Sequence, residues 1–325
     1  MALAFRTLLR RASPAGTAAR LSVLIYHRVL AEPDPLNSGE PTGAEFETRL
    51  RWIKAQFHVM PLHEAIAGLR NGSLPERALA ITFDDGYADN FDVALPILTR
   101  LGLHATFFVA TGFLDGGRMF NDTVVEAVRR FRGDELDLTS LGLDRYPTGS
   151  LQARVTAIRS ILHRVKYLPL EARSEIADGI ARRVGAALPT DLMMTSKQVA
   201  AAAVAGIEIG AHTVRHPILA RLDRAAARRE IEDSRRHLER ITGKPVRLFA
   251  YPNGRPGTDY TDETVALVRE LGFFGAVTTS PGSAGVGDDP YQVPRFTPWA
   301  RDTIRFGLQL WRNAGQAPTV VPCPC

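Results

Sequence analysis

Residues 78–87 read ALAITFDDGY, a largely apolar run that ends in two adjacent carboxylates and a glycine. The run Ala78 to Phe83 has apolar residues at both alternating sets of positions, which is typical of a parallel strand covered on both faces. Asp84 and Asp85 follow at the carboxyl end of this strand. Gly86 permits a sharp turn, so the two side chains need not point to opposite faces. The stretch predicts both a sheet and the position of a site at its edge.

Similar short runs recur along the chain and alternate with helical patterns. Helices are expected at 44–57, 223–241 and about 261–271, each with apolar residues repeating along one face. The expected strands are Leu21–Tyr26, Ala78–Phe83, Ala105–Ala110, Gly206–Ala211, Arg247–Tyr251, Phe273–Thr278 and Gln292–Phe296. Strands and helices in this rhythm predict an α/β fold, a closed or nearly closed barrel of parallel strands.

One stretch, from about Leu114 to Thr195, breaks the rhythm. It is polar, has helical patches at 123–131 and 151–167, and is interrupted by prolines. We expect a helical insertion in the loop after the strand at 105–110. The predicted organisation is an N-terminal tail at 1–20, one domain at 21–300 with its core motifs at 78–300, and a C-terminal tail at 301–325.

Composition is ordinary for a globular protein. Of 325 residues, 45% are hydrophobic and 23% are charged. The net charge of +5 comes from arginines spread along the chain and mixed with acidic residues. Without a clustered basic arm or a reading motif, we expect no nucleic-acid partner. Both cysteines, Cys323 and Cys325, lie at the chain end, where a frayed tail is the simpler interpretation than a metal site.

The N-terminus leaves two locations open. Its apolar start is short and arginine-rich, and we identify no signal peptide and no span of the roughly 20 apolar residues that cross a bilayer. Leu3, Phe5, Leu8 and Leu9 could share one helical face. Peripheral membrane contact through this segment therefore stays open beside a cytoplasmic location.

Two further polar clusters stand at strand ends. Residues 212–216 read HTVRH, and two imidazoles four residues apart can turn toward one metal ion. Residues 249–254 read FAYPNG, a turn whose backbone N–H groups can serve a ligand. Each cluster alone has an ordinary explanation: helix-capping aspartates, a core or surface histidine, a plain loop. A calcium loop is disfavoured because Gly86 occupies its third position.

These polar clusters all follow the carboxyl ends of predicted strands. The carboxyl ends of parallel strands meet at one mouth of a barrel, where sites are built. His27 follows the strand at 21–26, and Arg295 lies in the last expected strand. One shared site explains these placements better than several unrelated features.

Together, Thr82 to Gly86, His212 to His216 and the turn Tyr251 to Gly254 resemble the motifs of the polysaccharide deacetylase family, the NodB-homology or family 4 carbohydrate esterases. The resemblance extends from about Leu21 to Trp299. It implies a distorted (β/α)7 barrel with parallel strands. It also implies an Asp-His-His metal site, which usually holds zinc.

The resemblance also implies roles for single residues. Asp85, His212 and His216 match the metal ligands, and Asp84 matches the general base. Tyr251 would give a backbone N–H to the oxyanion.

Two family features are absent. The family's usual arginine beside the third motif is replaced by Phe249-Ala250, so Arg295 is expected to supply the charge near Asp84. The late Leu-x-His motif is missing. His27, in Tyr26-His27-Arg28-Val29, resembles the general acid of members that carry it before the Asp-Asp motif.

The implied function is metal-dependent hydrolysis of the N-acetyl group of an N-acetylated sugar or polysaccharide, with release of acetate and a glycan as partner. One alternative is an amidase acting on a small non-sugar amide. A non-catalytic glycan-binding relative is another, although Asp84, Asp85, His212 and His216 are all present. A membrane-associated scaffold would bind lipid with no dependence on metal.

Overall fold

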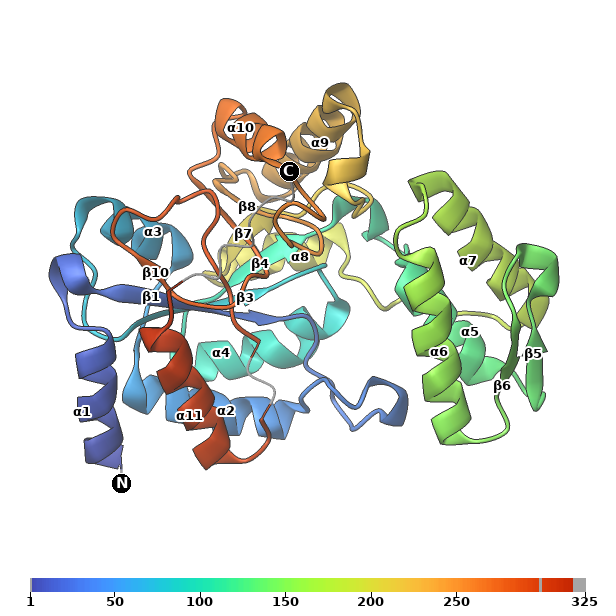
Figure 1. The fold of residues 1–325 in the computed structure, drawn as a ribbon, viewed down its shortest axis with the longest axis horizontal. Coiled ribbons are helices and arrows are strands. Elements are labelled where there is room, and N and C mark those ends of the chain that lie inside the picture. Colours follow the sequence, from blue (N-terminus) through green and yellow to red (C-terminus); the bar gives the residue numbers. More distant parts are fainter. Residues whose placement is uncertain (1, 298–299, 318–325) are drawn as a thin grey trace.

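The structure is a computed structural model that describes residues 2–297 and 300–317, with side chains from Phe5 onward. Its centre is a curved, mostly parallel sheet wrapped by helices (Figure 1). The strands lie in the order β10-β1-β3-β4-β7-β8-β9, with β2 beside β3. Their bounds are β1 Arg20–Tyr26, β2 His58–Val59, β3 Ala78–Phe83, β4 Thr106–Val109, β7 Glu208–Ala211, β8 Leu248–Ala250, β9 Gly275–Val277 and β10 Ala284–Gly285.

The segment 292–296 closes the sheet between β9 and β1. Isolated parallel bridges join it to both strands, and the Phe296 N–H donates to Val23 O at 2.8 Å. The prediction of a regular strand here is wrong, because Pro294 has no N–H and interrupts a continuous ladder. The sheet is nevertheless the distorted barrel that the sequence predicted, with β10 added antiparallel to β1.

Helices cover the outside of the barrel. The helices predicted at 44–57, 223–241 and 261–271 are confirmed as α2, α9 and α10. The α9 helix is capped by Asp223, whose carboxylate accepts from the Ala226 N–H at 2.7 Å. The covering helices are α2 Gly43–Gln56, α3 Leu62–Asn71, α4 Leu95–Leu101, α8 Ser196–Val204, α9 Arg224–Thr242 and α10 Asp262–Glu270.

The stretch predicted as an insertion forms a separate lobe beside the barrel, at the right of Figure 1. It contains α5 Phe120–Arg130, β5 Glu135–Asp137, β6 Arg145–Pro147, α6 Leu151–Val165 and α7 Leu170–Val184. These elements enclose their own apolar core, which includes the fully buried Ile161 and Ile180. The antiparallel β5–β6 pair and α7 were not predicted. Each strand has three residues, too few to show an alternating pattern.

Both end segments that were interpreted as tails contain helices packed on the barrel. These are α1 Ala2–Ala12 and α11 Thr303–Gly315. In α1, Leu9 is fully buried and the Phe5 ring lies 5.2 Å from the Trp52 ring. In α11, Phe306 and Leu310 are buried. The side chain of Leu3, and all of Trp299, Cys323 and Cys325, lie outside the described residues.

Among the residues that the structure describes, none belongs to a helix with the length and apolar character needed to cross a membrane.

Close packing inside the barrel gives a test of the fold. At Gly210 in β7, an added Cβ would lie 2.3 Å from Cδ1 of the buried Phe108 ring. We expect Gly210→Ala to lower the free energy of unfolding by about 1–3 kcal/mol through overpacking, as measured by urea denaturation. Gly39→Ala is the matched control, because a Cβ there meets no atom within 4 Å. Equal stability of the two variants would contradict this packing.

Candidate metal centre and active site

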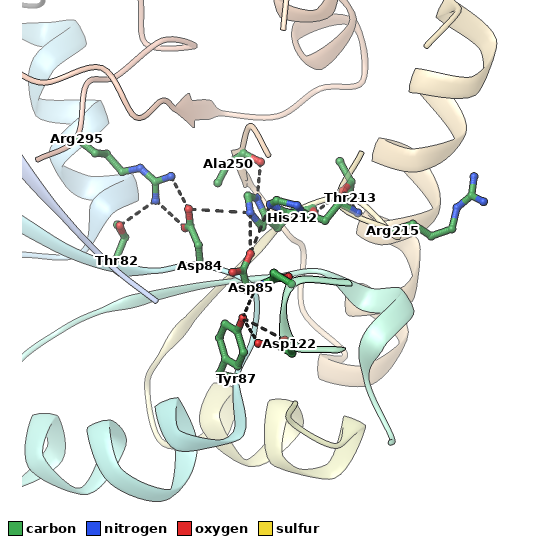
Figure 2. Close-up of polar contacts among 12 residues, drawn as sticks. Thr82, Asp84, Asp85, Tyr87, Asp122, His212, Thr213, Arg215, Ala250 and Arg295 are labelled. Atoms are coloured by element: carbon green, nitrogen blue, oxygen red, sulfur yellow. Dashed lines mark hydrogen bonds and ion pairs between the residues drawn. The ribbon is translucent and has the colours of Figure 1, made fainter. Parts of the chain in front are cut away.

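An unusual backbone conformation turns the two carboxylates after β3 into the barrel mouth. Asp85 has φ 75° and Gly86 has φ 87°, left-handed values that are rare for a non-glycine residue. A Cβ at Gly86 would also lie 2.9 Å from Val109 Cγ1. The turn is fixed by the Asp84 N–H, which donates to Tyr26 O at 2.9 Å. Asp84 and Asp85 both point toward His212, which follows the end of β7 (Figure 2).

Asp85, His212 and His216 form a compact set of potential metal ligands. Asp85 Oδ1 lies 3.4 Å from His212 Nε2 and 3.5 Å from His216 Nε2. One ligand atom from each residue lies within 4.8 Å of the others. Tetrahedral ligands about 2.0–2.1 Å from zinc are about 3.3–3.4 Å apart, close to these separations. Asp85 Oδ1 is buried and accepts no hydrogen bond, so these residues fit a metal ion.

The pKa values of the two imidazoles are shifted in opposite directions. Burial lowers the pKa of His216 to about 3, which leaves its ring neutral. Burial also acts against a charge on His212, but the carboxylates of Asp84 and Asp85 outweigh it and raise its pKa. His212 Nδ1 lies 2.7 Å from Ala250 O, a carbonyl that can only accept. His212 Nδ1 therefore carries a hydrogen, and Nε2 faces Asp85.

Asp84 is held in a separate ion pair with Arg295. Two guanidinium nitrogens donate to its two oxygens at 2.7 and 2.6 Å. Arg295 also donates to Thr82 Oγ1 at 3.1 Å and to Thr278 O at 2.8 Å, and it is 1% exposed. Burial would raise the pKa of Asp84, but the charges of Arg295 and His212 lower it below its ordinary value. The structure thus brings Arg295 to Asp84.

The loop between the two histidines is braced by Glu230 of α9. Its Oε2 accepts from the Val214 N–H at 3.0 Å and from the Arg215 N–H at 2.8 Å. Within the loop, Thr213 Oγ1 accepts from the His216 N–H at 3.1 Å. Such outer contacts orient the ligands of a metal site.

Arg173 of α7 connects the insertion to the same loop. Its Nη2 donates to His216 O at 3.0 Å, and its guanidinium carbon lies 4.3 Å from the Phe120 ring centroid. Burial lowers the pKa of Arg173 to about 10. The insertion therefore supports the candidate metal site directly.

A cavity of about 340 Å³ opens between the barrel and the insertion. The barrel side is lined by His27, Asp84, Asp85, His212, His216, Asn253 and Thr279. The insertion side is lined by Met119, Phe120, Asn121, Leu162, Lys166 and Arg173. The insertion, whose role the sequence did not predict, therefore forms one wall of the cavity beside the predicted site residues.

The structure does not bring Tyr251 to this cavity. Tyr251 is fully buried, its N–H donates to Val277 O at 3.3 Å, and its hydroxyl donates to Tyr291 O at 3.0 Å. Asn253 is the residue of this turn that lines the cavity, with φ 59°. Within the described part of the chain, its N–H forms no hydrogen bond.

Sequence reasoning missed Glu230, Arg173 and Asn253. Glu230 had a signal: it falls three residues after Ala227 on the apolar face of α9, where a charged residue needs a buried partner. Arg173 had none, because its approach to His216 depends on how the insertion folds back. Asn253 lay inside a quoted motif, but the motif does not say which N–H of the turn stays free.

A sequence model of the family described as polysaccharide deacetylase matches residues 71–153 and 179–276, together more than half of the chain. The matched residues include Asp84, Asp85, His212 and His216. The unmatched gap between the two ranges falls inside the insertion.

Individual relatives agree with this match. YxkH from Bacillus subtilis, named as a polysaccharide deacetylase, is 23% identical over 279 residues, covering 85% of this chain and 71% of that protein. Poly-beta-1,6-N-acetyl-D-glucosamine N-deacetylase from Staphylococcus epidermidis is 32% identical over 112 residues, 30% of this chain and 38% of that protein. The structure of Streptococcus pyogenes deacetylase PplD in complex with acetate gives a TM-score of 0.61 at 20% identity, covering 91% of this chain and 98% of that one. The last likeness shows the fold.

The buried ion pair predicts a specific pattern of stability. Arg295→Met should lower the free energy of unfolding at pH 7 by about 3–5 kcal/mol, because Asp84 is left buried without its partner. Adding Asp84→Asn removes the unpaired charge and should recover part of the loss. Urea denaturation of the metal-free proteins measures both effects.

The pH dependence of this stability difference tests whether the ion pair is its source. The folded-state pKa of Asp84 is lowered, so the pair stabilises the protein above the unfolded pKa and loses this effect as pH falls through the folded value. The difference in free energy of unfolding between wild type and Arg295→Met should therefore shrink as pH falls. A gap that is unchanged at low pH would contradict the ion pair as its source.

Proposed function

Because the chain belongs to the polysaccharide deacetylase family, hydrolases that act on carbon–nitrogen bonds of acetylated sugars, we propose that it removes N-acetyl groups from a glycan and releases acetate in a metal-dependent reaction. One observation carries this proposal. Asp85, His212 and His216 converge beside Asp84, which is ion-paired with Arg295, and all but Arg295 line one cavity. The cavity volume lies in the range of small-molecule sites, about 300–1,000 Å³, which suits a sugar unit.

Asp85, His212 and His216 would hold the metal ion, and zinc suits one carboxylate and two imidazoles. When bound, the ion supplies Lewis-acid polarisation of the acetyl carbonyl and a lowered pKa for water. The hydrogen bond between His212 Nδ1 and Ala250 O directs Nε2 toward this position.

Asp84 is the proposed general base. Arg295 lowers its pKa and keeps it ionised, so it can accept a proton from the attacking water. The two hydrogen bonds from Arg295 also fix the carboxylate in one orientation. Orientation matters because proton transfer requires the base within hydrogen-bond reach of the water.

His27 and Asn253 complete the proposed site. His27 lines the cavity from the end of β1, where its imidazole can donate a proton to the leaving sugar amine. The Asn253 N–H, in place of the Tyr251 N–H, is the proposed donor to the oxyanion. Its support is that Asn253 lines the cavity, whereas the Tyr251 N–H is used within the sheet.

Removal of the proposed base gives the main activity test. Asp84→Asn should reduce turnover by roughly 100-fold or more. Acetate release is measured with chitooligosaccharides, poly-N-acetylglucosamine and small amides as substrates. Asp178→Asn, an exposed position on α7, is the matched control. A near-native rate for Asp84→Asn would remove Asp84 from the mechanism, and activity on small amides alone would favour the amidase alternative.

Removal of a proposed ligand gives a test that does not depend on the substrate. His212→Ala should lose bound metal as well as activity, because only two of three protein ligands remain. Elemental analysis of the purified variant measures the metal content, with the exposed His58→Ala as control. Stoichiometric metal in His212→Ala would refute this ligand assignment.

A further inference from the structure

The α11 helix has two apolar faces. The first packs against the barrel through the buried Phe306 and Leu310. The second consists of Ile304, Leu308 and Trp311, which are 65%, 44% and 36% exposed. Their spacing of four and three residues places them in one stripe along the helix. This stripe faces away from the core.

The α1 helix lies alongside α11, although the two come from opposite ends of the chain (Figure 1). A Cβ at Gly307 would lie 3.4 Å from Phe5 Cζ, and one at Gly315 would lie 4.0 Å from Ala12 Cβ. Leu8 of α1 is 46% exposed. Four of the seven large hydrophobic side chains that are exposed in the described residues therefore belong to these two helices. An apolar concentration of this kind marks an interaction surface.

Unpaired positive charge accompanies the apolar stripe. Arg6 and Arg11 on α1, and Arg305 and Arg312 on α11, are exposed, and within residues 2–297 and 300–317 none of them forms an ion pair. Neither helix contains Asp or Glu. By contrast, the exposed Arg236 of α9 pairs with Glu232. Arg10 of α1 pairs with Glu76, but the charge of the other four arginines is left free for an external partner.

We propose that α1 and α11 together dock on an anionic lipid bilayer. We name the set Leu8, Arg11, Ile304, Arg305, Leu308, Trp311 and Arg312 the α1–α11 surface. Its apolar residues would enter the interfacial region, with Trp311 at headgroup level, and its arginines would contact anionic headgroups. A second copy of the chain is a poorer partner, because two such basic surfaces repel each other.

The exposed apolar side chains come mainly from α11 and not from the N-terminal segment that the sequence suggested. Phe5 and Leu9 face the barrel, so the N-terminal segment alone does not present the apolar face that its sequence suggests. The α11 helix supplies three of the four exposed apolar side chains. The helices α1 and α11 lie at the end of the molecule opposite the insertion, which forms one wall of the cavity (Figure 1). Docking would therefore leave the cavity open.

Sedimentation with vesicles tests the proposal directly. The full chain is mixed with sucrose-loaded vesicles of phosphatidylcholine alone or of an equimolar mixture with phosphatidylglycerol. We expect binding to the mixed vesicles, much weaker binding to phosphatidylcholine, and release by salt, because salt screens exposed charges. The readout is independent of metal and of glycan, so it does not depend on the proposed function.

Matched variants locate the contact. Arg305→Gln with Arg312→Gln should weaken binding roughly 10-fold or more, since each cation near an anionic surface contributes about fivefold. Arg229→Gln on α9 is the control for charge. Ile304→Asn with Leu308→Asn should also weaken binding, whereas Val204→Asn, at an apolar position that is 84% exposed, should not.

Three outcomes would overturn the proposal. The wild type could fail to bind mixed vesicles or bind both vesicle types equally. The α11 variants could bind as strongly as their controls. Sedimentation velocity without lipid could reveal a dimer that the α11 variants abolish, which would assign the α1–α11 surface to a second copy.

Discussion

Two adjacent carboxylates are buried at the end of β3, and each requires its own positive charge. Asp84 obtains it from Arg295 through two hydrogen bonds. Among the described residues, the ion-pair partners of Asp85 are His212 and His216, and His216 is neutral because burial lowers its pKa to about 3. The charges of Asp84 and Asp85 raise the pKa of His212 against the effect of burial, which favours a proton on that ring. A divalent ion at this position would replace that proton and balance the site more completely, since metal binding requires deprotonated ligands.

These two charge pairs lie next to each other and interact, because His212 Nε2 also lies 4.0 Å from Asp84 Oδ2. Arg295 reaches Asp84 from the segment 292–296, which Pro294 keeps from becoming a regular strand but which still closes the barrel. The histidine loop follows β7, two strands away from β3, and is held from outside by Glu230 and from the insertion by Arg173. The side chains in the cavity therefore depend on the barrel for their direction. They depend on the insertion for their enclosure.

The sequence predicted the features that local patterns encode. The strand ends at Asp84 and His212 follow from apolar runs that stop at polar clusters, and parallel strands bring such ends together. The sequence did not reveal contacts that arise from distant segments. Arg173 approaches His216 only because α7 folds back on the barrel, and α11 packs only because α1 and β1 offer it a surface. The motif suggested the Tyr251 N–H as the oxyanion donor, but this N–H donates to Val277 O within the sheet. The motif alone does not distinguish an N–H used by the sheet from the free N–H of Asn253.

The most direct test of the central claim is X-ray absorption spectroscopy of the zinc-loaded protein, which identifies the atoms that surround the metal. The account predicts nitrogen and oxygen ligands at about 2.0–2.1 Å, with the outer scattering of two imidazole rings from His212 and His216. Sulfur ligands at about 2.3 Å, as Cys323 and Cys325 would provide, or a spectrum without imidazole scattering would contradict it.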